Sequence, residues 1–102
     1  VLGMTGEVDY VRDAKRNAII DNGHPLMAKV TAMGCAGSAY LAACLAVESD
    51  PWRATVGALV VLGVAGELAA ERARGPGSFA IEMVDAMHNL DRATLISKAK
   101  VN

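Results

Sequence analysis

The chain has 102 residues, which is enough for one small domain and too few for two. Hydrophobic residues make up 53% of the chain and charged residues 21%, a balance that excludes a disordered or collagen-like protein. Ten Lys and Arg residues against eleven Asp and Glu residues give a formal net charge of −1. The sequence therefore offers no basic footprint for nucleic acid and no polybasic strip for an anionic membrane.

The N-terminal third is predicted to form β-strands. Residues 1–4 are a short apolar run typical of a buried strand, and residues 8–11 and 18–20 carry β-branched and aromatic side chains. The polar residues 12–15 are expected to turn the chain between the last two strands. His24 precedes a proline, which favours an extended or turn conformation, and we interpret it as a loop residue.

The remaining two thirds is predicted to be helical. A first helix is expected from about Gly34 to Val47, within the uncharged run 30–47. That run is only weakly apolar and close to the minimum length for crossing a bilayer, so a buried helix of a soluble protein is expected. Asp50 can cap a second helix over residues 51–74, where a proline fills the first position.

The second helix carries three glycines, Gly57, Gly63 and Gly66, which favour close packing against a neighbouring helix or subunit. A third helix is expected over residues 78–89, with an apolar stripe of Phe79, Met83, Met87 and Leu90 that packs into the core. Asp91 can cap a last short helix. Strands followed by helices in so short a chain indicate an α/β fragment or a small α+β domain.

Chemistry is most plausible in residues 27–37, where small residues lead into a helix N-terminus. The first amides of a helix have no intrahelical partner and the helix dipole favours negative charge, so this turn can hold a phosphate or a developing anion. An ordinary, closely packed helix start fits the same pattern. Two interpretations of Cys35 are open. It is a polarised thiol, because the pKa of a free cysteine is about 8.5 and falls at helix N-termini, or it is a small buried side chain.

The two cysteines do not predict a disulfide. On one helix, Cys35 and Cys44 would lie on opposite faces, so the chain is expected in a reducing compartment, the cytoplasm. We expect Cys44 in the core and His88 on a solvated face. Glu67 and Glu71 are expected at a solvated helix end, and no His, Cys or carboxylate spacing indicates a metal site.

Five segments resemble, in order and spacing, the hydroxyethylthiazole kinases of thiamine biosynthesis. Residues 5–10 (TGEVDY) and 75–79 (GPGSF) match family motifs directly. Residues 22–27 (NGHPLM) and 29–35 (KVTAMGC) are similar to the family's NGHPL and KVTGTGC, and residues 85–90 (DAMHNL) to its DALYNL. The likeness covers nearly the whole chain and is specific because the motifs occur together.

The resemblance implies a ribokinase-like three-layer α/β fold, of which residues 1–102 are the C-terminal part of a single domain. It implies transfer of a phosphoryl group from ATP, with Mg²⁺, to the hydroxyl of 4-methyl-5-(2-hydroxyethyl)thiazole. By the same likeness Cys35 is the catalytic position, Thr5 contacts ATP and the backbone of Ala32 meets the thiazole. The amides of Met33 and Gly34 complete an anion hole, which suits a reaction that needs positioning and charge stabilisation.

Two departures from the family pattern bear on activity. Ala32 and Met33 stand where the family has Gly and Thr, so Ala32 is strained if the position needs a positive φ, and Met33 adds bulk and lacks a hydroxyl. The family's domain is more than twice as long, and its remaining part supplies the Mg²⁺ ligands. We therefore expect a missing or separate N-terminal segment and, as the family implies, a homotrimer. The alternative is a non-catalytic ribokinase-like fragment or assembly module that has lost turnover.

Overall fold

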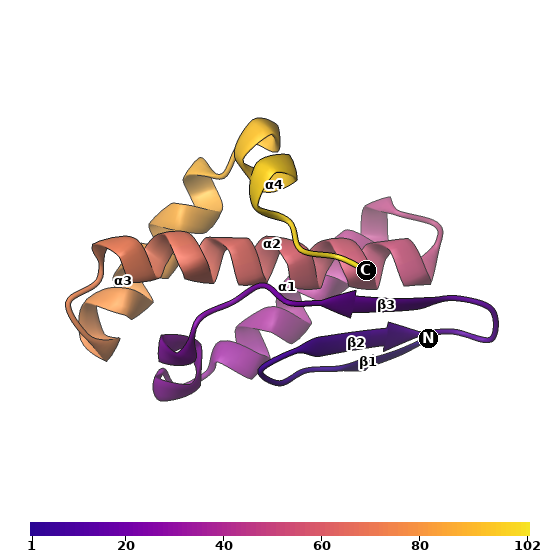
Figure 1. The fold of residues 1–102 in the computed structure, drawn as a ribbon, viewed down its shortest axis with the longest axis horizontal. Coiled ribbons are helices and arrows are strands. Elements are labelled where there is room, and N and C mark those ends of the chain that lie inside the picture. The colour runs from indigo at the N-terminus through magenta and orange to yellow at the C-terminus, as the bar shows by residue number, and fades with distance from the viewer.

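The computed structural model describes residues 1–102 and contains one small sheet and four α-helices (Figure 1). Three antiparallel strands lie in the order β1-β2-β3, with β1 at Leu2–Met4, β2 at Asp9–Arg12 and β3 at Asn17–Ile20. In the register, Val11 faces Gly3 on one side and Ala18 on the other. The predicted order of strands followed by helices is confirmed.

The helices follow the strands along the chain. They are a short 3₁₀ helix η1 at Pro25–Lys29 and the α-helices α1 at Met33–Val47, α2 at Pro51–Arg72, α3 at Pro76–Asn89 and α4 at Arg92–Lys98. Helix α3 begins two residues before the predicted start, because a proline lacks the N–H that is unbonded at the first helical position anyway. The Gly75 carbonyl accepts the N–H of Phe79 at 3.0 Å and closes the first turn.

Both predicted aspartate caps are confirmed. Asp50 accepts the backbone N–H of Trp52 at 3.0 Å, and Asp91 accepts that of Thr94 at 2.7 Å. His24 acts in the same way at η1, where its Nδ1 atom accepts the N–H of Leu26 at 3.1 Å. The three side chains satisfy amides that the helices cannot bond internally, and His24 is the loop residue that its position before a proline predicts.

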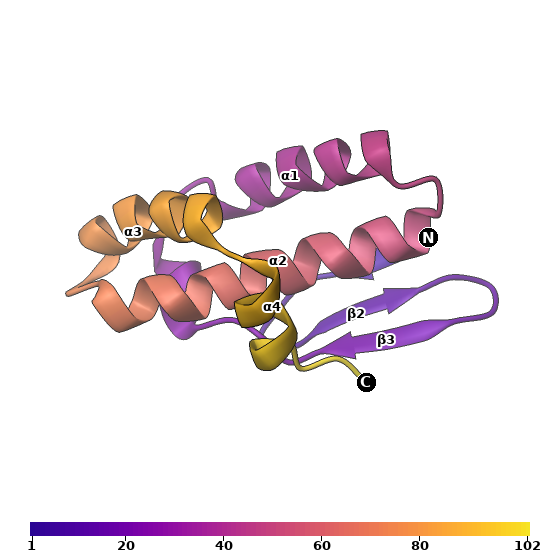
Figure 2. The same ribbon diagram turned by 90° about the horizontal axis from the view of Figure 1, so that it is seen from above.

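Helix α2 is the central element of the fold. Figure 2 shows α2 between α1 on one side and strands β2 and β3 on the other, and ten of its residues are buried. It is the one helix long and apolar enough to cross a membrane, but 61% of its most apolar stretch is buried inside the protein. The uncharged middle of α2 is therefore covered by the rest of the protein on most sides.

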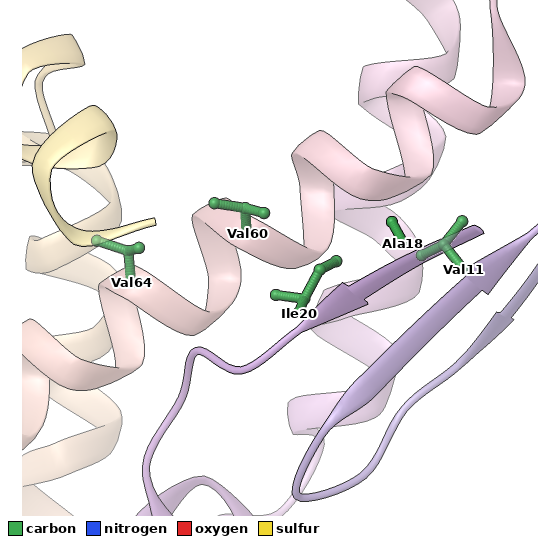
Figure 3. Close-up of a cluster of buried hydrophobic side chains, with 5 residues drawn as sticks. All are labelled: Val11, Ala18, Ile20, Val60 and Val64. Atoms are coloured by element: carbon green, nitrogen blue, oxygen red, sulfur yellow. The ribbon is translucent and has the colours of Figure 1, made fainter. Parts of the chain in front are cut away.

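Two apolar clusters make up the core. The first joins the inner face of the sheet to α2 (Figure 3). It contains Val11, Ala18, Ile20, Val60 and Val64. The second joins α2 to α3 around Phe79, which is fully buried, and Met83. Met87 packs at the edge of the second cluster and Leu90 at the edge of the first, so the predicted stripe of α3 faces the core.

The glycines of α2 have different surroundings. A Cβ atom added to Gly63 would lie 2.6 Å from Cβ of Asn22, and one added to Gly66 would lie 2.5 Å from Sδ of Met27. Nothing lies within 4 Å of the same position at Gly57. The expected close packing therefore exists at two of the three glycines, and its partners are the loop residue Asn22 and, in the 3₁₀ helix η1, Met27.

Two expectations of burial are wrong. All three residues of β1 are exposed, because β1 is the sheet edge farthest from β3 and only Gly3 of the strand faces α2, where its Cβ position is 3.2 Å from Cγ2 of Thr55. Helix α1 contains no buried residue, since its extensive contacts are with α2 alone. Cys44, expected in the core, is accordingly only half-buried.

The last residues of the chain pair with the outer edge of β3. Ile19 and Asn102 exchange two backbone hydrogen bonds of 2.9 Å, and Ile20 forms an antiparallel bridge with Val101. Ion pairs hold this segment to α2, where Lys100 lies 3.4 Å from Glu67 and Lys98 lies 3.7 Å from Glu71. Glu71 is exposed, as expected for a solvated helix end, whereas the side chain of Glu67 is only 20% exposed, against that expectation.

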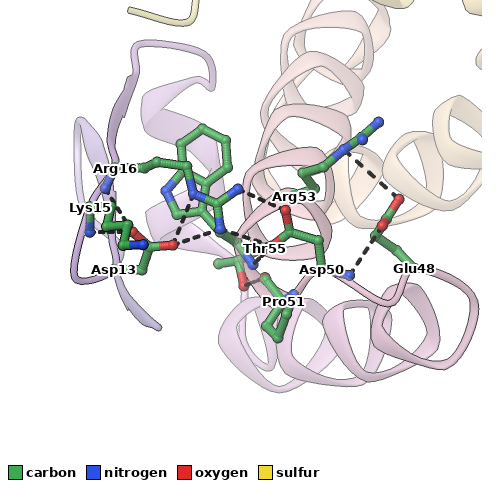
Figure 4. Close-up of polar contacts among 9 residues, drawn as sticks. Asp13, Lys15, Arg16, Glu48, Asp50, Pro51, Arg53 and Thr55 are labelled. Carbon is green, nitrogen blue, oxygen red and sulfur yellow. Dashed lines mark hydrogen bonds and ion pairs between the residues drawn. The ribbon is translucent and has the colours of Figure 1, made fainter.

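A polar cluster fastens the β2–β3 turn to the start of α2. The guanidinium of Arg16 contacts carboxylates of Asp13 and Asp50, each at 2.7 Å, and lies 4.6 Å from the ring centre of Trp52 (Figure 4). The hydrogen bond from Arg16 lowers the pKa of Asp13 to about 2 and also holds the pKa of Asp50 below its usual range. Asp50 therefore has two roles: it caps α2, and it binds Arg16 of the β2–β3 turn.

The Arg16 cluster predicts acid sensitivity. Asp13 titrates at about pH 2 in the folded protein and near its ordinary value, about 3.9, when unfolded. Its contribution to stability is therefore present above about pH 4 and is lost as the pH falls through about 2. Urea unfolding between pH 5 and 2 should show a modest loss of stability, as expected for an exposed ion pair, that is smaller in Arg16→Gln. An equal loss in the variant would contradict this assignment.

Candidate functional site

The start of α1 has an unusual backbone. Ala32, the residue before the helix, has φ 69° and ψ 12°, and it is the sole non-glycine residue in the chain with positive φ. Left-handed geometry costs an L-amino acid with a Cβ about 1–2 kcal/mol. The expectation that this position is strained without glycine is confirmed, and strain of this kind is typical of functional sites.

Three backbone amides at this turn have no partner within the protein. The first helical hydrogen bond runs from the N–H of Ala36 to the carbonyl of Ala32 at 2.9 Å, which leaves the N–H groups of Met33, Gly34 and Cys35 unbonded. No side chain caps the helix, and its first turn holds no acidic residue. The positive end of the α1 dipole is therefore free to receive an anion.

The side chains around these amides leave the turn open. Ala32, Gly34 and Cys35 are exposed, and Cys35 is a free thiol. Met33 instead packs against the buried cluster that contains Phe79. The bulk that Met33 adds relative to threonine is therefore directed at least partly into the core, not only into the site.

Thr5 lies apart from this turn. It follows β1, is exposed and makes no side-chain hydrogen bond, while the next residue, Gly6, donates its N–H to Asp9 at 3.0 Å. Burial raises the pKa of the Asp9 carboxyl, and the bond from Gly6 opposes that rise. The residues from Ala32 to Cys35 thus share one turn at the start of α1, while Thr5 belongs to the loop between β1 and β2.

Two grooves of the protein lie elsewhere. One, of about 240 Å³, is lined by α2, α3 and α4 and carries Glu71, Glu82 and Asp85. The other, of about 460 Å³, is mostly apolar and lies between α1, α2 and α4, beside Tyr40 and Cys44. No group of three His, Cys, Asp or Glu side chains is arranged to hold a metal ion. Unbonded backbone donors therefore lie at the starts of two helices, three N–H groups at α1 and those of Gly77 and Ser78 at α3, and the α1 turn is the one that also carries the exposed Cys35 thiol.

Sequence reasoning missed one buried polar residue, Asn22. Its amide nitrogen donates to Glu67 at 3.0 Å and to the Lys98 carbonyl at 2.8 Å, and its oxygen accepts the Lys100 N–H at 2.7 Å. The next residue, Gly23, has a positive φ of 122°. No local sequence signal predicts that Asn22 makes these three hydrogen bonds, because its partners lie 45 to 78 residues away.

Comparisons with known proteins identify relatives of this chain. The profile of the hydroxyethylthiazole kinase family matches residues 1–93. A probable hydroxyethylthiazole kinase of Agrobacterium fabrum is 47% identical over 95% of this chain, and a hydroxyethylthiazole kinase of Granulibacter bethesdensis is 48% identical over 97%. The solved structure of a hydroxyethylthiazole kinase protein from Pyrococcus horikoshii OT3 superimposes with a TM-score of 0.94 at 40% identity over 98% of the chain.

The chain spans little more than a third of the length of these relatives. It covers 39% of the Agrobacterium protein, 36% of the Granulibacter protein and 39% of the Pyrococcus chain. Within that span, the profile match takes in the TGEVDY motif, the turn before α1 and the GPGSF motif. The chain therefore belongs to the hydroxyethylthiazole kinase family.

Proposed function

We propose that residues 1–102 are the C-terminal part of a single ribokinase-like kinase domain. We propose further that the complete protein transfers a phosphoryl group from ATP to the hydroxyl of 4-methyl-5-(2-hydroxyethyl)thiazole, a step of thiamine biosynthesis. Family membership supports the reaction. The observation that carries the site is the exposed start of α1, where three amides have no partner in the protein.

The proposal gives each residue of the turn a role. The N–H groups of Met33, Gly34 and Cys35 stabilise charge on the phosphoryl group in transfer, which is the main demand of this chemistry. The backbone of Ala32 contacts the thiazole ring. The Cys35 thiol orients the substrate hydroxyl and accepts its proton, while Thr5 contacts ATP.

ATP and Mg²⁺ are the implied cofactors. The unbonded amides and the uncompensated helix dipole fit a phosphate group, whose charge they would share. The chain has no cluster of acidic side chains suited to Mg²⁺, so we assign the metal ligands to the part of the family domain outside residues 1–102. Bound Mg²⁺ would neutralise charge on the phosphates during transfer.

The remaining proposals concern partners and location. The substrate is a small molecule, and neither nucleic acid nor a membrane is required. We propose a cytoplasmic homotrimer whose N-terminal segment is supplied by the rest of the protein. Exposed apolar side chains on α1, among them Leu45 and Val47, support further contacts of this face in the complete assembly.

The test uses the full-length protein with the thiazole alcohol, ATP and Mg²⁺, and measures the phosphate ester by ³¹P NMR. We expect turnover, and a loss of about 10²-fold in kcat for Cys35→Ala, the lower range for removing a group that handles a proton. Cys44→Ala is the matched control, since its half-buried thiol lies within α1, away from the turn. Absence of ester from a folded, full-length preparation would reject the kinase function.

The strained Ala32 supports a second candidate, a non-catalytic assembly module that retains the kinase fold. A site that has lost turnover can keep a left-handed alanine without penalty to function. In that case Ala32→Gly combined with Met33→Thr should create activity that the natural protein lacks. Activity in the natural protein itself would reject the module.

A further inference from the structure

Gly63 and Gly66 of α2 form a contact surface, called the seam below, against which Asn22 and Met27 of the segment before the candidate site pack. Gly63 and Gly66 are buried and lie three residues apart, hence on one face of the helix. Asn22 sits against Gly63 and Met27 against Gly66, at distances that leave no room for a side chain. These glycines therefore serve close approach, and the seam sets how near the segment comes to α2.

Asn22 fixes one end of that segment. Its side chain is 6% exposed and makes three hydrogen bonds, to Glu67 on α2 and to backbone groups of Lys98 and Lys100. Buried amide groups with all these bonds formed resist displacement, because each broken bond leaves a buried group unsatisfied. These bonds therefore hold Asn22, the residue from which the segment runs toward the candidate site, at a defined position against α2.

Met27 lies between this fixed point and the site. A Cβ atom at Gly66 would meet Sδ, Cγ and Cε of Met27 at 2.5, 3.1 and 3.3 Å, so the whole end of the methionine covers the glycine. From Met27 the chain continues through the end of η1 to the left-handed Ala32 and α1. Val30 and Met33 pack against the same buried cluster as Met27, so the cluster is shared by the methionine and the residues on either side of Ala32.

We propose that Met27, through its contact with Gly66, is a positioning residue for the phosphoryl-binding turn at Ala32–Cys35. This inference rests on the proposed kinase function. Misplacing a reacting group by about 1 Å can lower the rate on the order of 10²-fold, so a small change in the seam affects turnover more than it affects binding. Met27 touches neither ATP nor the thiazole in this proposal.

The experiment enlarges the side chain on one side of the seam and shortens the one opposite, in the full-length protein. Gly66→Ala adds a methyl group that must push Met27, and Met27→Ala removes the obstacle. We expect Gly66→Ala to lower kcat about tenfold, a shift well below the 1 Å case, with KM for ATP unchanged within about twofold. The double variant Gly66→Ala with Met27→Ala should recover kcat to within about threefold of the parent, since the added methyl then has room.

Gly57→Ala is the matched control, because the same substitution in the same helix meets nothing within 4 Å. It should leave kcat unchanged. A folded Gly66→Ala variant with the parent kcat, or a double variant no faster than Gly66→Ala, would overturn the proposal. Thermal unfolding of each variant identifies a loss of activity that comes from unfolding alone.

A second measurement does not depend on catalysis. The amide NMR signals of Met33, Gly34 and Cys35 should move in Gly66→Ala and return toward the parent positions in the double variant. If the parent protein forms no thiazole phosphate but these signals shift and recover, the kinase function fails while the coupling across the seam stands. Unmoved signals in Gly66→Ala would reject the coupling whatever the activity.

Discussion

Phe79→Ala should lower the free energy of unfolding by about 3–5 kcal/mol, the range for removing a buried aromatic ring. Phe79 is fully buried and is the largest side chain of the cluster that joins α2 to α3. The same cluster supports Met27 and Met33 on either side of Ala32. Loss of the ring therefore opens a cavity between α2 and α3, within the cluster against which Met33 packs.

Urea unfolding of the purified protein measures this loss. Ile81→Ala is the control on the same helix, because the Ile81 side chain is 68% exposed and surface substitutions usually change stability by less than about 0.5 kcal/mol. A loss below about 1 kcal/mol for Phe79→Ala would mean that α3 is not packed on α2 through this ring.

Gly63→Ala and Gly57→Ala should change stability in opposite directions, although the two substitutions are chemically the same and lie on one helix. At Gly57 the new methyl meets nothing, so the gain in helix propensity, about 1 kcal/mol, is realised. At Gly63 it would lie 2.6 Å from Cβ and 3.0 Å from the carbonyl carbon of Asn22. Backbone cannot move aside as a side chain can, and overpacking of this kind costs about 1–3 kcal/mol.

Denaturant unfolding of the two variants, side by side, measures the sign of each change. Gly63→Ala should also weaken protection of the Lys100 amide from hydrogen exchange, since that N–H is bonded to Asn22 at 2.7 Å. Two variants of equal stability would show that Asn22 is not held against α2 at Gly63.

Most of the local structure could be predicted because its causes are local. Asp50 before a proline and Asp91 before α4 cap their helices through bonds to amides two and three residues away. The spacing of Phe79 and Met83 placed one face of α3 in the core. The family's glycine at position 32 raised the question of a positive φ, and the structure answers it with left-handed geometry at Ala32.

Burial was predicted less well, because it depends on what lies opposite a segment. The uncharged sequences of α1 and α2 are similar in character, yet α2 has ten buried residues and α1 has none. The difference is that α2 lies between α1 and the sheet, while α1 has α2 as its one extensive neighbour (Figure 2). The same reasoning applies to β1, an edge strand whose apolar side chains are exposed.

The amino-acid sequence by itself determined the order of elements, the helix ends and the family, since caps, periodicity and motifs are carried by residues near one another. Only the tertiary structure decided that Asn22 joins α2 to the C-terminal segment, and that Gly63 and Gly66 receive the chain before the site. Those contacts link residues 39 or more positions apart. Such pairs meet only after the chain has folded, so no local pattern encodes their distance.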